Sequence, residues 1–201
     1  MESTLYQELF NGKFPVSLRY DGAYIAMNTL AWKTACIPEA AFDLERRVAR
    51  LDDRMQIELS IRRYHEADAV EWFIELYDDS SYDTQILEDI RFADLTLDFA
   101  PQTSPFFLDY NGSNEQLCDF LENRTQLFHR ARRNLRCEGG RSSSMQMPYF
   151  NILMDGYGYT LAIGWSGQWQ AELVRPGDEG RLVFAAGMED ARFRLHPGER
   201  V

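Results

Sequence analysis

Hydrophobic and polar residues alternate through much of the first half of this chain. A period of two places every second side chain on the same face of a strand, so each alternating run predicts a half-buried β-strand. The last of these runs slips in phase at Ala93-Asp94, which indicates a β-bulge. Residues 39–50 also fit a short helix, and the pattern alone leaves that alternative open. The alternating runs are Phe14–Leu18, Phe42–Val48, Met55–Ile61, Val70–Leu76 and Ile90–Phe99.

The alternation breaks between Pro101 and Met147. Phe106–Leu108 fits another strand, and residues 115–133 fit either a short helix or an irregular loop. The piece from Arg130 to Arg141 forms a local basic patch, which we interpret either as a solvated loop or as a docking patch for an acidic surface on a partner. The arginines of this patch are Arg130, Arg132, Arg133, Arg136 and Arg141.

The final third of the chain predicts a series of hairpins. Tyr149–Leu153 and Thr160–Trp165 are apolar runs on either side of the tight turn at residues 155–158. Gln168–Val174 and Leu182–Ala186 flank a second turn, and Phe193–Leu195 ends the series. Many short strands with polar turns and no alternating helices predict an all-β sandwich or barrel. No repeat or linker is visible, so residues 1–201 are expected to form one domain.

Composition and charge narrow the classes of partner. The chain has 201 residues, is 45% hydrophobic, and carries a formal net charge of −11, which is typical of a globular acidic protein. This charge disfavours binding to nucleic acid and to anionic membranes. No apolar run approaches the length needed to span a bilayer, and the first residues do not resemble a signal peptide. Three scattered cysteines, Cys36, Cys118 and Cys137, are typical of reduced thiols in a cytoplasmic protein.

The sequence offers no catalytic or metal-binding constellation, and we assign no cofactor. The segment Gly164-Trp165-Ser166-Gly167-Gln168 resembles a nucleophile elbow, but Gln168 stands where a second glycine is needed. The three histidines, His65, His129 and His196, are too far apart in sequence for the usual spacing of metal ligands.

Two tryptophans are the strongest candidates for a binding site. Trp165 and Trp169 flank a short glycine-containing segment near a predicted strand end. Indole faces can stack on a sugar ring, and Gln168, Asn151 or Asp155 can then bind the sugar hydroxyls. The alternative is that both tryptophans pack inside the sandwich or against a neighbouring domain, and their spacing favours this alternative.

Several segments resemble, in the same order, the N-terminal domain of family 36 glycoside hydrolases, the α-galactosidases and their relatives. The most specific are Ala162–Trp169 and the ending Pro197-Gly198-Glu199. The others are Ala69–Leu76, Gln85–Ile90, Gly140–Ser144, Pro148–Asn151, Gly187–Glu189 and Leu195–His196. The resemblance implies a large antiparallel β-sandwich (a supersandwich) with minor helix or loop insertions.

The resemblance also implies a function for the whole enzyme and a limited role for this chain. Members of the family hydrolyse terminal α-galactosides by a retaining mechanism, with both catalytic aspartates on a (β/α)₈ barrel. A barrel needs about 250 residues, so we expect none here, no catalytic residue in this chain, and no activity from the chain alone. The implied partners are that barrel, α-galactoside sugars and, optionally, identical copies. The alternatives are a free-standing carbohydrate-binding module that uses Trp165 and Trp169, and a structural interaction domain.

Overall fold

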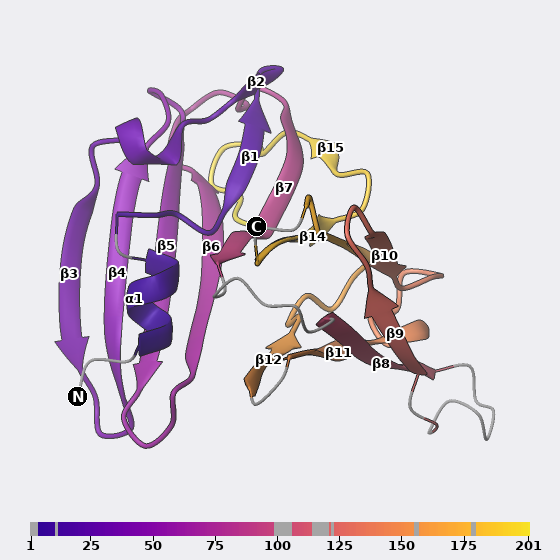
Figure 1. The fold of residues 1–201 in the computed structure, drawn as a ribbon. Coiled ribbons are helices and arrows are strands. Elements are labelled where there is room, and N and C mark those ends of the chain that lie inside the picture. The colour runs from indigo at the N-terminus through magenta and orange to yellow at the C-terminus, as the bar shows by residue number, and fades with distance from the viewer. Residues whose placement is uncertain are drawn as a thin grey trace. The chain divides into compact units, whose positions relative to one another are not determined.

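The structure, a computed structural model, describes residues 4–10, 12–98, 106–113, 121, 123–154, 157–177 and 180–201. Three antiparallel sheets make up almost all of its regular structure, so the prediction of an all-β sandwich is confirmed. The chain forms two compact units (Figure 1): unit 1 contains residues 1–92 and 190–201, and unit 2 contains residues 93–189. Strand β7 passes from one unit into the other. Two compact units that share a strand can belong to one domain or to two. The prediction that residues 1–201 form one domain therefore stays a prediction.

Unit 1 contains the four-stranded sheet β3-β4-β5-β6 and the strand set β7-β1-β2, with β15 paired to β7. In Figure 1 the four strands of the sheet stand side by side. The elements are α1 (Thr4–Phe10), β1 (Ser17–Tyr20), β2 (Ala23–Tyr24), the 3₁₀ helix η1 (Met27–Thr29), β3 (Lys33–Pro38), β4 (Phe42–Arg50), β5 (Met55–Tyr64), β6 (Val70–Asp78), β7 (Leu87–Asp98) and β15 (Arg192–Phe193).

The core of unit 1 follows the alternation in the sequence. Ile57, Leu59 and Ile61 of β5 are fully buried, as is Leu18 of β1, because every second side chain of a strand faces the same side. Helix α1 packs on the face of this sheet. Its Phe10 ring makes an edge contact with Trp72 of β6, with ring centroids 5.5 Å apart.

Helix α1 is also held by a polar contact to β4. The Tyr6 hydroxyl donates to Glu45 at 2.5 Å, and Arg47 donates to the same carboxylate at 2.6 Å. Glu45 is 6% exposed, and a buried carboxylate needs hydrogen-bonding or charged partners. Tyr6 and Arg47 supply these partners.

The last residues of the chain extend the β3-β4-β5-β6 sheet beyond β6. Leu76 and Val201 exchange two backbone hydrogen bonds of 2.7 and 3.0 Å, Asp78 N–H donates to Glu199 O at 3.0 Å, and Gly198 N–H donates to Asp78 O at 3.0 Å. The terminal segment therefore covers the last part of the β6 edge, from Leu76 to Asp78.

Unit 2 is built from the sheet β12-β11-β8-β9 and the strand set β10-β13-β14, to which the second part of β7 belongs. The edge contact between Phe150 of β11 and Phe184 of β14, with ring centroids 5.6 Å apart, joins the two layers. The remaining strands are β8 (Phe106–Ser113), β9 (Asn123–Leu127), β10 (Arg132–Arg136), β11 (Met145–Met154), β12 (Tyr157–Ala162), β13 (Trp169–Val174) and β14 (Arg181–Met188).

Some sequence expectations differ from the structure. The helix considered for residues 39–50 is wrong, because this segment pairs in register with β5 over its whole strand length. Of the segment 115–133, residues 115–120 and 122 lie outside the described residues, and the rest contains β9 and the start of β10 instead of a helix. The burial pattern of β7 does change phase, but between Ile90 and Ala93 and not at the predicted Ala93-Asp94, since Ala93, Leu95 and Leu97 are buried in phase.

The described residues contain no helix that is long and apolar enough to cross a membrane. Cys36 is exposed and Cys137 is buried, both as free thiols; Cys118 lies outside the described part of the chain.

Candidate functional site

The first predicted site residue, Trp169, begins β13 and is completely buried. Its indole N–H donates to Ser142 O at 2.7 Å, and its backbone N–H contacts Cys137 Sγ at 3.2 Å. This environment matches the packing role that was the alternative for both tryptophans. The structure leaves no exposed indole face at this position.

Gln168, the second predicted residue, links three parts of the chain. Its side-chain amide donates to Cys137 O and to Glu189 Oε2, both at 2.5 Å, and its carbonyl accepts from Gly140 N–H at 2.8 Å. Both N–H groups of this amide and one lone pair of its carbonyl are therefore used within unit 2, which favours a structural role for Gln168.

The other three predicted residues differ in their surroundings. Trp165 is half-buried, and its indole packs so closely on Gly167 that a side chain there would overlap the ring. Asn151 lies in the middle of β11, in another sheet from Trp169. Asp155 lies outside the described residues. Sugar binding by these five residues together stays a prediction.

Asn151 belongs to a row of polar side chains that sequence reasoning missed. Thr160 of β12 is opposite Asn151, Asn151 is opposite Asp109 of β8, and Asp109 is opposite Arg124 of β9. We call these four residues the polar row. It crosses all four strands, on the face away from the core side chains Phe150, Ile152 and Met154.

Two side-chain contacts organise the polar row. The Thr160 hydroxyl donates to Asn151 Oδ1 at 2.9 Å. Arg124 donates to both carboxylate oxygens of Asp109 at 2.8 and 2.7 Å, the bidentate geometry in which this pair is strongest. The only sequence signal for the row was Asn151, because cross-strand register decides which residues face one another.

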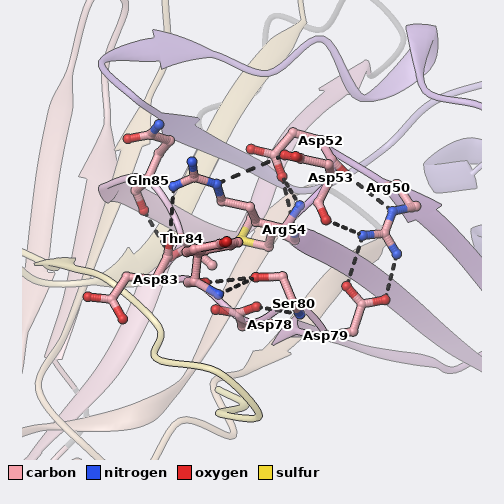
Figure 2. Close-up of polar contacts among 12 residues, drawn as sticks. Arg50, Asp52, Asp53, Arg54, Asp78, Asp79, Ser80, Asp83, Thr84 and Gln85 are labelled. Atoms are coloured by element: carbon pink, nitrogen blue, oxygen red, sulfur yellow. Dashed lines mark hydrogen bonds and ion pairs between the residues drawn. The ribbon is translucent and has the colours of Figure 1, made fainter.

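A second polar cluster lies in unit 1, where the β4–β5 turn meets the segment after β6 (Figure 2). Arg50 donates to both oxygens of Asp79 at 2.5 and 2.9 Å, and to the backbone carbonyls of Asp52 and Asp53. Arg54 donates to Asp83 O at 3.0 Å. We call this group the turn cluster. It ties together segments about 30 residues apart in sequence.

The carboxylates of the turn cluster are held by specific donors. Burial alone would raise the pKa of Asp52, but donation from the N–H groups of Arg54 and Met55 and from the Tyr20 hydroxyl outweighs it and lowers that pKa. Burial is also the main cause that raises the pKa of Tyr20 to about 12. The Arg50 hydrogen bond lowers the pKa of Asp79.

The C-terminal segment adds a histidine to this region, and the end of β6 adds a buried carboxylate. His196 Nδ1 lies 2.9 Å from Asp83 Oδ1, and this hydrogen bond raises the pKa of His196. Asp78 is fully buried; Oδ1 accepts from Ser80 N–H at 2.8 Å, and Oδ2 has no partner among the described residues.

The chemistry available to the turn cluster is limited. In the described part of the chain no group of three or more His, Cys, Asp or Glu side chains is placed to hold a metal ion. Asp52 and Asp79 already accept strong hydrogen bonds from backbone and guanidinium donors. The arrangement fastens the turn, as aspartates in turns commonly do, and it offers no reactive pair of carboxyls.

Two of the five arginines of the arginine patch pair with glutamates within unit 2. Arg132 pairs with Glu172 at 2.6 Å, and Arg136 lies 3.4 Å from Glu138 and 3.6 Å from Glu189. These contacts favour the interpretation of a solvated segment over that of a docking patch.

Comparison with known proteins gives structural matches only. No family model and no curated protein matches the sequence. The structure resembles the GH36 α-galactosidase AgaA from Geobacillus stearothermophilus, solved in complex with 1-deoxygalactonojirimycin, with a TM-score of 0.63 and 13% identity. It also resembles the α-N-acetylgalactosaminidase NagBb from Bifidobacterium bifidum in complex with GalNAc, with a TM-score of 0.55 and 13% identity.

These matches are nearly complete for this chain and partial for the enzymes. They cover 94% and 92% of this chain but only 29% and 31% of AgaA and NagBb. The chain therefore spans less than a third of the length of the solved enzymes it matches, and the matched region is their N-terminal part. The fold that the sequence resemblance implied is confirmed: this chain shares the fold of the N-terminal part of family 36 glycoside hydrolases.

Proposed function

We propose that this chain is the non-catalytic β-sandwich part of a retaining glycoside hydrolase that acts on terminal α-galactosides. In this role it packs on a catalytic barrel and shapes substrate access or assembly. The observation that carries the proposal is the match of 94% of the chain to 29% of an α-galactosidase. A second match, to an enzyme named for N-acetylgalactosamine, supports a galactose-type substrate.

The side chains support a non-catalytic role. A retaining glycosidase needs two carboxyls about 5 Å apart on either side of the glycosidic bond. The most concentrated carboxylates that the structure describes belong to the turn cluster, where arginines and backbone N–H groups hold them. The proposal therefore assigns bond cleavage to the barrel. The free thiols of Cys36 and Cys137 support a reducing, cytoplasmic location as part of the same proposal.

The test compares the native product with its parts. We expect the native coding frame to continue past Val201 for at least the length of a barrel, about 250 residues. The complete product should hydrolyse an aryl α-galactoside, residues 1–201 alone should not, and the remainder alone should lose stability or activity. A native product that ends at Val201, or a longer one without glycosidase activity, would overturn the proposal.

A further inference from the structure

We propose that the polar row, together with Tyr149, forms a binding site for a neutral hexopyranoside on the open face of the β12-β11-β8-β9 sheet. The site is distinct from the predicted Trp165–Trp169 site and shares only Asn151 with it. The inference stands on the geometry of unit 2 and does not depend on the presence of a catalytic barrel.

The charges of the row favour a neutral ligand. Asp109 is 6% exposed and accepts two hydrogen bonds from Arg124, so its charge is compensated within the protein, and the half-exposed Arg124 side chain is the member of the pair that a ligand can reach. Asn151 and Thr160 contribute an amide and a hydroxyl, which are neutral. A phosphorylated or carboxylated ligand would find no uncompensated cation in the row, whereas sugar hydroxyls can both donate to and accept from these groups.

The aromatic component is Tyr149, two residues before Asn151 on the same strand. It is 61% exposed, and its neighbour across the strand pair is the small residue Ala162. Residues i and i+2 of a strand project from the same face about 7 Å apart. A sugar ring stacked on the Tyr149 ring would therefore place its hydroxyls toward Asn151 and the half-exposed Arg124 side chain.

An exposed aromatic ring beside oriented polar side chains is a common arrangement for binding carbohydrates. An amphipathic aromatic ring covers the apolar face of the ligand, while a few oriented polar groups fix its orientation. The strands hold these groups on a rigid sheet, so little side-chain ordering opposes binding. The Thr160–Asn151 and Arg124–Asp109 hydrogen bonds orient the polar groups before any ligand arrives.

The test is a calorimetric titration of residues 1–201 with methyl α-galactoside and with N-acetylgalactosamine at millimolar concentrations. We expect saturable binding to at least one of them. Tyr149→Ala should weaken it about tenfold, through lost stacking, and Asn151→Ala about fivefold, through a lost hydrogen bond to a hydroxyl. Tyr82→Ala is the matched control, because Tyr82 is 71% exposed and lies in unit 1.

Each result decides the question. Binding that is lost in Tyr149→Ala and kept in Tyr82→Ala supports the site. An absence of binding in the parent chain, or binding that Tyr149→Ala and Asn151→Ala leave unchanged, overturns it. Binding lost in Trp165→Ala and kept in Tyr149→Ala would assign the sugar to the tryptophan segment instead. None of these results bears on whether a barrel follows Val201, so this proposal and the proposed function fail independently.

Discussion

At the scale of single residues, the burial of Trp169 determines what this side chain can do. Its indole is fully buried and hydrogen-bonded to Ser142 O. We expect Trp169→Ala to lower the free energy of unfolding by about 3–5 kcal/mol, because a large buried side chain is replaced by a cavity. Urea denaturation followed by circular dichroism measures this change. Trp165→Ala should cost clearly less, since Trp165 is partly exposed; equal losses would contradict this interpretation.

Tyr20 allows a second test at the residue scale. Its hydroxyl donates to Asp52 at 2.8 Å and accepts from Gln85 N–H at 3.2 Å. We expect Tyr20→Phe to lower the free energy of unfolding at pH 7 by about 1–2 kcal/mol, the usual range for such hydrogen bonds. Tyr82→Phe is the control, because that side chain is largely exposed.

The pH dependence of the Tyr20→Phe effect follows from the pKa of Asp52. That pKa is lowered in the folded chain from 3.8, so the contribution of Asp52 is complete above pH 3.8 and is lost as the pH falls through the folded value. The stability difference between the parent chain and Tyr20→Phe should therefore narrow as the pH falls below 3.8. A difference that stays constant down to the lowest pH at which both chains fold would contradict the role of the ionised carboxylate.

At the scale of elements, the terminal segment acts as a short strand on the edge of β6. Removing residues 198–201 would break their four backbone hydrogen bonds to β6 and expose the β6 edge from Leu76 to Asp78. We expect this truncation to lower the free energy of unfolding by about 2 kcal/mol, after the entropy of the ordered residues is subtracted. The open edge should also promote self-association, which sedimentation velocity would detect.

The matched control for this truncation is Arg200→Ala. Arg200 pairs with Glu75 at 3.1 Å, and its side chain is 62% exposed. An exposed ion pair of this kind contributes little to stability, on the order of 0.5 kcal/mol. If Arg200→Ala is as damaging as the truncation, side-chain charge and not edge pairing holds the segment.

The elements also show where sequence patterns succeed and fail. Alternating runs predicted β5, β6 and β7 because one face of each strand is more buried than the other. In β4 the alternating run was Phe42–Val48, but the buried residues Glu45 and Ala49 lie on the opposite face. Strand β3 was missed because all six of its residues are exposed, so no alternation marks it. Strands β9 and β10 were missed because they have five residues each and are mostly polar, and a few residues cannot separate a strand from a helix turn.

The candidate sites also differ in how far the sequence predicts them. A tryptophan-rich segment is visible in a sequence, but whether Trp169 faces solvent depends on packing that its neighbours do not reveal. The polar row was almost invisible, because Thr160, Asp109 and Arg124 reach Asn151 only through the register of three strand pairs. Local patterns predict which side of a strand is buried, whereas the residues that meet across a sheet are fixed by pairing.

At the scale of the whole molecule, charge decides which partners are excluded. The chain carries −11 overall, and two arginines of its most basic segment, Arg132 and Arg136, pair with glutamates. A protein binds duplex DNA mainly by neutralising phosphates with unpaired basic side chains. The pairing of Arg132 and Arg136 reduces the positive charge that this patch can offer, and the overall charge of −11 opposes the approach of a polyanion.

We expect no binding of a fluorescein-labelled DNA duplex to residues 1–201 at low ionic strength, measured by fluorescence anisotropy. The glutamates that pair with the arginines contribute to this lack of DNA binding. The double variant Glu172→Gln, Glu189→Gln should therefore bind the duplex weakly. This binding should disappear as salt is added, because counterion release drives it. Binding by the parent chain that falls with salt and is weakened by Arg132→Ala would show that the patch is an anion site after all. If neither the parent chain nor the double variant binds the duplex, the total negative charge, and not the local ion pairs, prevents phosphate binding.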